Sequence, residues 1–326
     1  MMKKATRAFL LITVSLCLAL SFSAVLLAAD EKPIQISIAS GPSGGGYYMV
    51  GAALAKVVQE HVPGFSVNSE ATGATSENLR LIVGKQSTIG MGMCNDVVAA
   101  YEGLRDFEKK PGTDLRILMA GQTNLFHVIV PANSDAKTLS DLKGKRISIG
   151  PAGAPFFVPD LLEKVAGLKR NVDYKGQYLG HDQAADALAN GDIDAIIAAV
   201  AYPSGAYSSL AMTQDVRFID FTDEDLKKVD ENFPYWRTGD IYIPKDTYKN
   251  AEPIRTVAIP VWLFADASTD EDVIYKFVKA ICEHTDELGK IHPDAGKYSI
   301  QTAIQGVTIV PFHPGAIRYF KEQGVM

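Results

Sequence analysis

The chain has 326 residues, which is long for one ordinary domain and sufficient for two. Apolar residues make up 47% and charged residues 21%, as in a soluble globular protein. The formal net charge of -6 gives little electrostatic support to nucleic-acid binding, so we expect no nucleic-acid partner, and an anionic ligand would need local donors.

The N-terminal segment has the pattern of a secretory signal peptide. Basic side chains such as Lys3 and Arg7 precede an uncharged apolar stretch over residues 8–29, which ends in two alanines. We expect cleavage there, so that residues 1–29 are removed and the mature protein is periplasmic. The stretch also approaches the length of a membrane span, and an uncleaved anchor is the alternative. No later segment could span a bilayer, so transport would require a membrane partner.

Strand-like and helix-like patterns alternate after this segment. Strands are predicted over 34–39, 65–69, 88–93, 115–119 and 126–130, and helices over 47–60, 76–83 and from 97. This alternation predicts a parallel sheet covered by helices. The polar segment 131–143 then indicates a crossover to a second lobe.

The alternation restarts in the second half of the chain. Strands are predicted over 146–149, 193–200 and 216–220, helices over 158–165 and 223–230, and a loop rich in Pro, Tyr and Gly over 233–253. The apolar stretch 256–265 is long enough to cross back, before helices over 270–283 and 315–323. We therefore predict lobe I from residues 30–128 plus 256–326 and lobe II from 129–255. A ligand would bind between the lobes, beyond the carboxyl ends of the strands.

A glycine-rich loop follows the first predicted strand and precedes a helix. Glycines let the backbone approach a ligand closely, and the first amides of a helix carry partial positive charge without an internal partner. A tight turn without a ligand is the alternative, although three consecutive glycines exceed what a turn requires. The candidate ligand-binding residues of this loop are Ser40, Gly41, Ser43, Gly45, Gly46 and Tyr47.

The same loop also fits one enzyme pattern. Gly41-Pro42-Ser43-Gly44-Gly45 is a G-x-S-x-G sequence between a predicted strand and helix, the context of a hydrolase nucleophile elbow. An exported serine hydrolase is therefore the alternative, with His292 or His313 as the base. Such an elbow would lie on the first strand, with no earlier strand and loop to supply half of the oxyanion hole. We accordingly expect a protein that is not an enzyme.

Other loops at predicted strand ends add candidates. Thr75 or Ser76 would cap the following helix, and capping alone is an alternative to ligand binding. Asp96 is expected to cap the helix from residue 97 rather than bind an ammonium group. Loops at 150–154 and 202–205 are placed to close over a ligand from the second lobe, unless they are ordinary turns. The candidates from these loops are Thr72, Thr75, Asn78, Asn95, Gly153, Ala154 and Tyr202.

The sequence shows no metal-ligand spacing, and we expect no metal or cofactor. The six histidines are scattered; His127 is expected to pack in the core and His313 to belong to a rigid structural turn. Cys94 and Cys282 remain after cleavage. A disulfide between them is one alternative, and two buried, inert thiols are the other, which we favour.

Seven segments together carry a resemblance to a known family. They are 40–51 (SGPSGGGYYMVG), 72–78 (TGATSEN), 95–96 (ND), 100–103 (AYEG), 142–146 (LKGKR), 191–195 (GDIDA) and 313–316 (HPGA). They resemble the TAXI-type solute receptors of TRAP transporters, over nearly all of the mature chain. Ala74 and Thr75 stand where that family often has a Gly-Ser pair, which leaves the ligand open.

The resemblance implies the fold, the partner and the class of ligand. The fold would be the two-lobed α/β periplasmic-binding-protein (Venus flytrap, type II) fold with two crossover strands. The partners would be sodium-coupled TRAP membrane subunits, and the protein is expected to be a monomer. The ligand would be a small anion such as glutamate, 2-oxoglutarate or another dicarboxylate, captured when the second lobe closes and excludes water.

Overall fold

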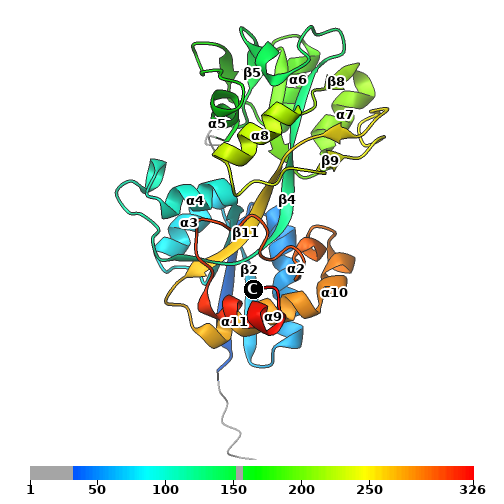
Figure 1. The fold of residues 1–326 in the computed structure, drawn as a ribbon. Helices are drawn as coiled ribbons and strands as arrows, with labels where there is room; N and C mark the ends of the chain where they lie inside the picture. The colour runs from blue at the N-terminus through cyan, green and yellow to red at the C-terminus, as the bar shows by residue number, and fades with distance from the viewer. Residues whose placement is uncertain (1–31, 152–156) are drawn as a thin grey trace, which may run out of the picture.

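The computed structural model describes residues 32–151 and 157–326. Two lobes are joined by long strands (Figure 1). We call the one containing β1–β3, α2–α4 and α9–α11 the lower lobe, and the one containing β5–β8 and α5–α8 the upper lobe. The expected signal peptide lies outside the described residues.

The secondary structure follows the predicted alternation and adds helices over 181–189, 205–213 and 285–291 that the sequence patterns did not predict. The strands are β1 (Ile34–Gly41), β2 (Phe65–Ala71), β3 (Ile89–Met93), β4 (Leu115–Pro131), β5 (Arg146–Ser148), β6 (Lys175–Gln177), β7 (Ala195–Val200), β8 (Val216–Phe218), β9 (Tyr242–Ile243), β10 (Ile254–Arg255) and β11 (Ala258–Asp266). The α-helices are α2 (Gly46–His61), α3 (Thr75–Val83), α4 (Cys94–Tyr101), α5 (Phe157–Lys164), α6 (His181–Ala189), α7 (Gly205–Thr213), α8 (Asp223–Asn232), α9 (Glu271–Glu283), α10 (Thr285–Ile291) and α11 (Pro314–Glu322). Short 3-10 turns η1 (Arg105–Phe107), η2 (Leu139–Leu142) and η3 (Ala295–Lys297) complete the list.

One curled sheet runs through both lobes. Its order is β2-β1-β3-β11-β4-β7-β5-β6, and β8 also pairs with β4. In the lower lobe β1, β2 and β3 are parallel, while β11 lies antiparallel between β3 and β4. In the upper lobe β5 is parallel to β6 and β7. The predicted α/β fold with two crossing strands is thus confirmed, with β4 and β11 at the crossing. The prediction of a parallel sheet is wrong in part, because β4 and β11 pair antiparallel with their neighbours and the sheet is mixed.

The first crossing differs from the prediction in its position. We predicted strands over 115–119 and 126–130 and a crossover at 131–143, whereas β4 is one strand of 17 residues. Its first half pairs with β11 and its second half with β7 and β8, so burial and pairing continue without a break. The polar segment after β4 instead packs on the upper lobe, where Arg217 donates to the carbonyl oxygens of Ser134 and Ala136.

Two predictions about buried side chains are confirmed. His127 is fully buried, and its ring nitrogens contact the Leu125 carbonyl oxygen and the Tyr248 hydroxyl. His313 is the N-cap of α11, where Nδ1 accepts from the Gly315 amide. Both cysteines are free, Cys94 buried and Cys282 half-buried. Among the described residues, no helix combines the length and apolar character that a membrane crossing needs.

Candidate functional site

A cavity of about 500 Å³ lies between the lobes, at the ends of the strands. The lower lobe contributes residues at or just after the ends of β1, β2 and β3, and the upper lobe contributes residues at or just after the ends of β5 and β7. Strand β4 supplies the side between them. The lining residues are Pro42, Gly45, Gly46, Tyr47, Gly73, Ala74, Thr75, Ser76, Met93, Gln122, Asn124, Gly150, Pro151, Phe157, His181, Ala198, Ala199, Val200, Ala201 and Asp294.

Three helices begin at residues that line this cavity. They start at Gly46 (α2) and Thr75 (α3) in the lower lobe and at His181 (α6) in the upper lobe; Phe157, the first described residue of α5, also lines it. A helix N-terminus presents unpaired N–H groups and a partial positive charge, which favour a bound anion. The lining contains no Arg or Lys among the described residues. An anion bound here would therefore be held by backbone amides and neutral side-chain donors.

Tyr47 connects the first helix to the crossing strand. Its hydroxyl interacts with the side chains of Asn124 and Thr75, while burial raises the pKa of the phenol well above its ordinary value. The phenol therefore stays protonated and can donate a hydrogen bond. Neighbouring Gln122 is 97% buried, and its Oε1 has no hydrogen-bond partner among the described residues. An unpaired buried acceptor is costly, so a ligand donor at this position would be stabilising.

Some predicted residues lie beneath the cavity rather than on its surface. The Asn78 amide donates to the carbonyl oxygens of Ser40 and Met91, at 2.7 Å each. Its Oδ1 accepts from the Thr72 hydroxyl at 2.6 Å. The Ser40 hydroxyl donates to the Glu70 carbonyl oxygen at 2.7 Å. This network ties the ends of β1 and β3 and the loop after β2 together, so it positions the lining residues.

The other predicted ligand-binding residues differ in whether they reach the cavity surface. Gly41 is buried and its carbonyl accepts from the Thr72 amide, whereas Ser43 is exposed on the turn before α2. Asn95 is buried in α4 and donates to Asp96. Tyr202 lies next to the lining residue Ala201. Of the predicted set, the structure brings Gly45, Gly46, Tyr47 and Thr75 onto the cavity surface; Gly153 and Ala154 lie outside the described residues.

The predicted helix caps need correction. Ala74, with φ 69°, is the N-cap of α3, and Thr75 is the first helical residue. The Thr75 hydroxyl accepts from the Met93 amide instead, which joins α3 to the end of β3. Helix α4 begins at Cys94, so Asp96 lies within its first turn and does not cap it. Asp96 instead faces Arg105, with 3.6 Å between Oδ1 and Nη1.

The lobes contact each other at two places beside the cavity. Arg105 of the lower lobe pairs with Asp160 of α5, at 2.5 Å. On the other side, the Lys297 ammonium lies 5.4 Å from the centre of the Tyr202 ring and 2.7 Å from Asp294. Burial raises the pKa of Asp96, next to the first contact, to about 7. These contacts bring the upper-lobe loops over the lower-lobe helix ends.

A hydrogen-bonded chain supports the upper wall. The Ser204 amide donates to the Tyr248 hydroxyl at 2.7 Å, and that hydroxyl lies 2.9 Å from His127 Nε2. His127 Nδ1 lies 2.8 Å from the Leu125 carbonyl oxygen, its acceptor. If Nδ1 carries the proton, Nε2 accepts from Tyr248 and every group is satisfied. The loop after β7 is thereby fixed to the crossing strand.

Sequence reasoning missed several lining residues. Gln122 and Asn124 lie inside β4, and a polar Gln-Thr-Asn run within an otherwise apolar strand was the signal that could have identified them. His181 and Asp294 come from distant segments that only the tertiary fold brings together. A second cavity of about 540 Å³ is lined by the upper lobe alone, near Asn133 and Asn190, and lies away from these strand ends.

Comparison with solved structures shows the same fold. A periplasmic sulfonate-binding protein from Methylobacillus flagellatus is 17% identical, with 90% of this chain and 78% of that chain covered and a TM-score of 0.51. A TctC solute-binding protein from Polaromonas is 15% identical, with 82% and 88% covered and a TM-score of 0.50. A Xanthomonas citri protein solved with ATP is 10% identical, with 89% and 96% covered and a TM-score of 0.52.

Two α/β lobes around a cavity at the strand ends define the class of periplasmic solute-binding proteins. Residues 38–324 match the NMT1-like family, and the chain belongs to this family of periplasmic substrate-binding proteins. Family membership makes it an extracytoplasmic solute-binding component of a transporter that works with membrane subunits, rather than an enzyme. The serine-hydrolase alternative is therefore not supported, and Ser43 lies on an exposed turn outside the cavity lining.

Proposed function

We propose that the chain is the solute receptor of a TRAP-type secondary transporter of the TAXI class and binds a small carboxylate anion in the interlobe cavity. The convergence of three helix N-termini on a cavity without Arg or Lys among its described lining residues supports the binding of an anion. The resemblance of seven sequence segments to the TAXI-type receptors supports the transporter class. The lobes would be residues 30–128 plus 256–326 and residues 129–255, with a signal peptide over 1–29. The protein would act as a monomer.

Within that class, we favour an amino acid such as glutamate over 2-oxoglutarate. The cavity contains acceptors as well as donors: Asp294 lines it, and Gln122 Oε1 has no partner among the described residues. An ammonium group would satisfy such acceptors while the carboxylates face the helix ends. Other dicarboxylates and sulfonates remain the comparison ligands, the latter because a sulfonate-binding protein shares the fold.

A ligand screen tests the proposal directly. On ligand-stripped protein, the true solute at a hundred times its Kd should raise the free energy of unfolding by about 2.7 kcal/mol and the melting temperature by several degrees. It should also reduce the radius of gyration measured by small-angle X-ray scattering. The fluorescence emission of Trp236, whose ring centre lies 4.0 Å from that of Phe233, should change as well. The panel is glutamate, glutamine, 2-oxoglutarate, C4–C6 dicarboxylates and alkanesulfonates. Tight binding without compaction would contradict capture by closure.

The transporter class requires a separate measurement. In cells that take up the identified solute, a sodium ionophore should abolish uptake if the membrane partner is sodium-coupled. Loss of uptake on ATP depletion with the sodium gradient clamped would instead assign the receptor to an ATP-driven transporter.

Tyr47→Phe should weaken solute binding by about 1–3 kcal/mol, or roughly five- to 160-fold, because a buried hydroxyl donor is removed. The hydroxyl interacts with Asn124 and Thr75 at the cavity wall, and both lose a partner. The control is Tyr48→Phe, since Tyr48 is adjacent in sequence but does not line the cavity. Calorimetric titration of both variants measures the difference, and equal affinities would remove Tyr47 from the site.

A further inference from the structure

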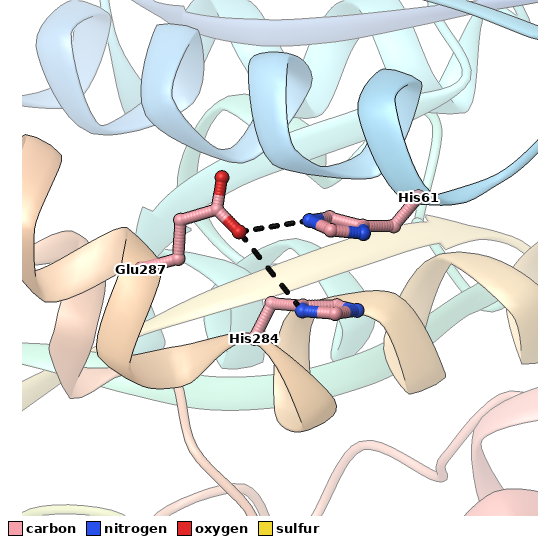
Figure 2. Close-up of side chains that lie close together, drawn as sticks. All are labelled: His61, His284 and Glu287. Carbon is pink, nitrogen blue, oxygen red and sulfur yellow. Dashed lines mark hydrogen bonds and ion pairs between the residues drawn. The ribbon is translucent and has the colours of Figure 1, made fainter.

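Three potential metal ligands converge on the lower lobe, outside the cavity lining. His61 ends α2, His284 lies between α9 and α10, and Glu287 is on α10 (Figure 2). His61 Nε2 lies 2.8 Å and His284 Nδ1 4.0 Å from the same carboxylate oxygen, Glu287 Oε2. The cluster was not predicted, because His61 is more than two hundred residues from the His284–Glu287 pair in the sequence.

The spacing suits one small cation. One ligand atom from each residue can be chosen so that all lie within 4.8 Å of one another. A tetrahedral zinc ion bound at about 2.0–2.2 Å holds its ligand atoms roughly 3.4 Å apart, between the two observed separations. Each side chain is about one-third exposed, so small rotations are not blocked and water can complete the coordination.

Electrostatics also favour a cation at this position. The two imidazole rings stack with their centres 3.4 Å apart and an interplanar angle of 10°, so one ring must rotate out of the stack for both to direct a nitrogen at the same ion. Glu60 interacts with Glu287, which places a second carboxylate in the cluster. His61 is also in the last turn of α2, where the helix carries partial negative charge. A bound cation would offset the negative charge that the two carboxylates and the helix end bring together here.

We propose that His61, His284 and Glu287 form a zinc site that links the end of α2 to the α9–α10 junction. Two imidazoles and one carboxylate are a ligand set that zinc accepts, whereas Mg²⁺ and Ca²⁺ prefer oxygen ligands alone. The bound ion connects an N-terminal helix with the C-terminal helices of the same lobe. It stabilises the folded lower lobe because the unfolded chain holds these ligands far apart.

The test uses tag-free, chelator-treated protein titrated with Zn²⁺ alone. We expect one ion bound per chain, a rise of several degrees in melting temperature at saturating zinc, and no comparable rise with Mg²⁺ or Ca²⁺. Co²⁺ as a probe should give the visible absorption of a low-symmetry, tetrahedral-like site. Absence of saturable zinc binding up to millimolar concentration would overturn the proposal.

Matched variants locate the ion. His61→Gln and His284→Gln should each weaken zinc binding at least tenfold and remove the Co²⁺ absorption, as should Glu287→Gln. Asp286→Asn is the control, because it removes the same charge from an exposed neighbour on the same helix. Unchanged zinc affinity in the His61→Gln/His284→Gln double variant, or an equal loss in Asp286→Asn, would show that the ion binds elsewhere.

Discussion

Gly46→Asp should abolish binding of an anionic solute while leaving the protein at least as stable as the parent. Gly46 is the first residue of α2 and lines the cavity, and a Cβ added there meets no atom within 4 Å. A carboxylate would occupy the end of the helix that an anion is proposed to use. Two like charges about 4 Å apart near a protein surface repel by about 4 kcal/mol, so we expect at least a hundredfold loss of affinity.

The same change should not harm the fold. Helix α2 has no acidic residue in its first turn, and a carboxylate at that position stabilises a helix by about 0.3–1 kcal/mol. Gly46→Asn is the matched control, nearly equal in size and without the charge. If the Asn and Asp variants lose affinity equally, the effect is steric. If neither loses affinity, the solute's negative charge lies elsewhere, and calorimetry together with thermal unfolding separates these cases.

The free energy of unfolding should fall steeply between about pH 6.5 and pH 4 because of His127. Burial lowers the pKa of this imidazole from 6.5 to about 4. In this pH range the imidazole therefore binds a proton in the unfolded chain but stays neutral in the native state. The contribution of neutral His127 to the free energy of unfolding is about 3 kcal/mol. It is fully present above pH 6.5 and is lost as the pH falls toward the folded pKa.

His127→Gln isolates this contribution. Its unfolding free energy should decline less between pH 7 and pH 4.5, by about 2–3 kcal/mol relative to the parent. His292→Gln, at a half-exposed position, is the control and should keep the parental slope. Urea unfolding at each pH, with a chelator present, provides the values. Parallel curves for His127→Gln and the parent would show that His127 does not remain neutral when folded.

The local patterns of the sequence predicted most of the secondary structure and one side of the cavity. Helix α2 runs over Gly46–His61, where 47–60 was expected, and the glycine loop before it reaches the cavity through Gly45, Gly46 and Tyr47. Such features depend on residues close in sequence: an apolar strand, glycines and the amphipathic helix that follows. The same reasoning identified the return strand and the N-cap turn at His313.

The prediction was weaker where a residue's role depends on distant partners. Asn78 was predicted to bind the ligand, but its amide donates to carbonyl oxygens of β1 and β3. Gln122 and Asn124 belong to a strand whose continuity through both lobes is set by β11 on one half and by β7 on the other. Asp294 reaches the cavity only because the C-terminal segment returns to the lower lobe. These arrangements are tertiary, and no local pattern encodes them.

The position of β11 between β3 and β4 has a consequence for how the molecule is made. The lower-lobe sheet has the order β2-β1-β3-β11-β4, so one of its interior strands, β11, is the last of the five to leave the ribosome. Until residues 258–266 are available, β3 and β4 have no partner on their facing edges, and the lobe cannot assemble cotranslationally. Its contacts join segments far apart in the chain, a high contact order that slows folding. The nascent polypeptide thus keeps an unassembled lower lobe through most of its synthesis, when a secretion channel can still accept it.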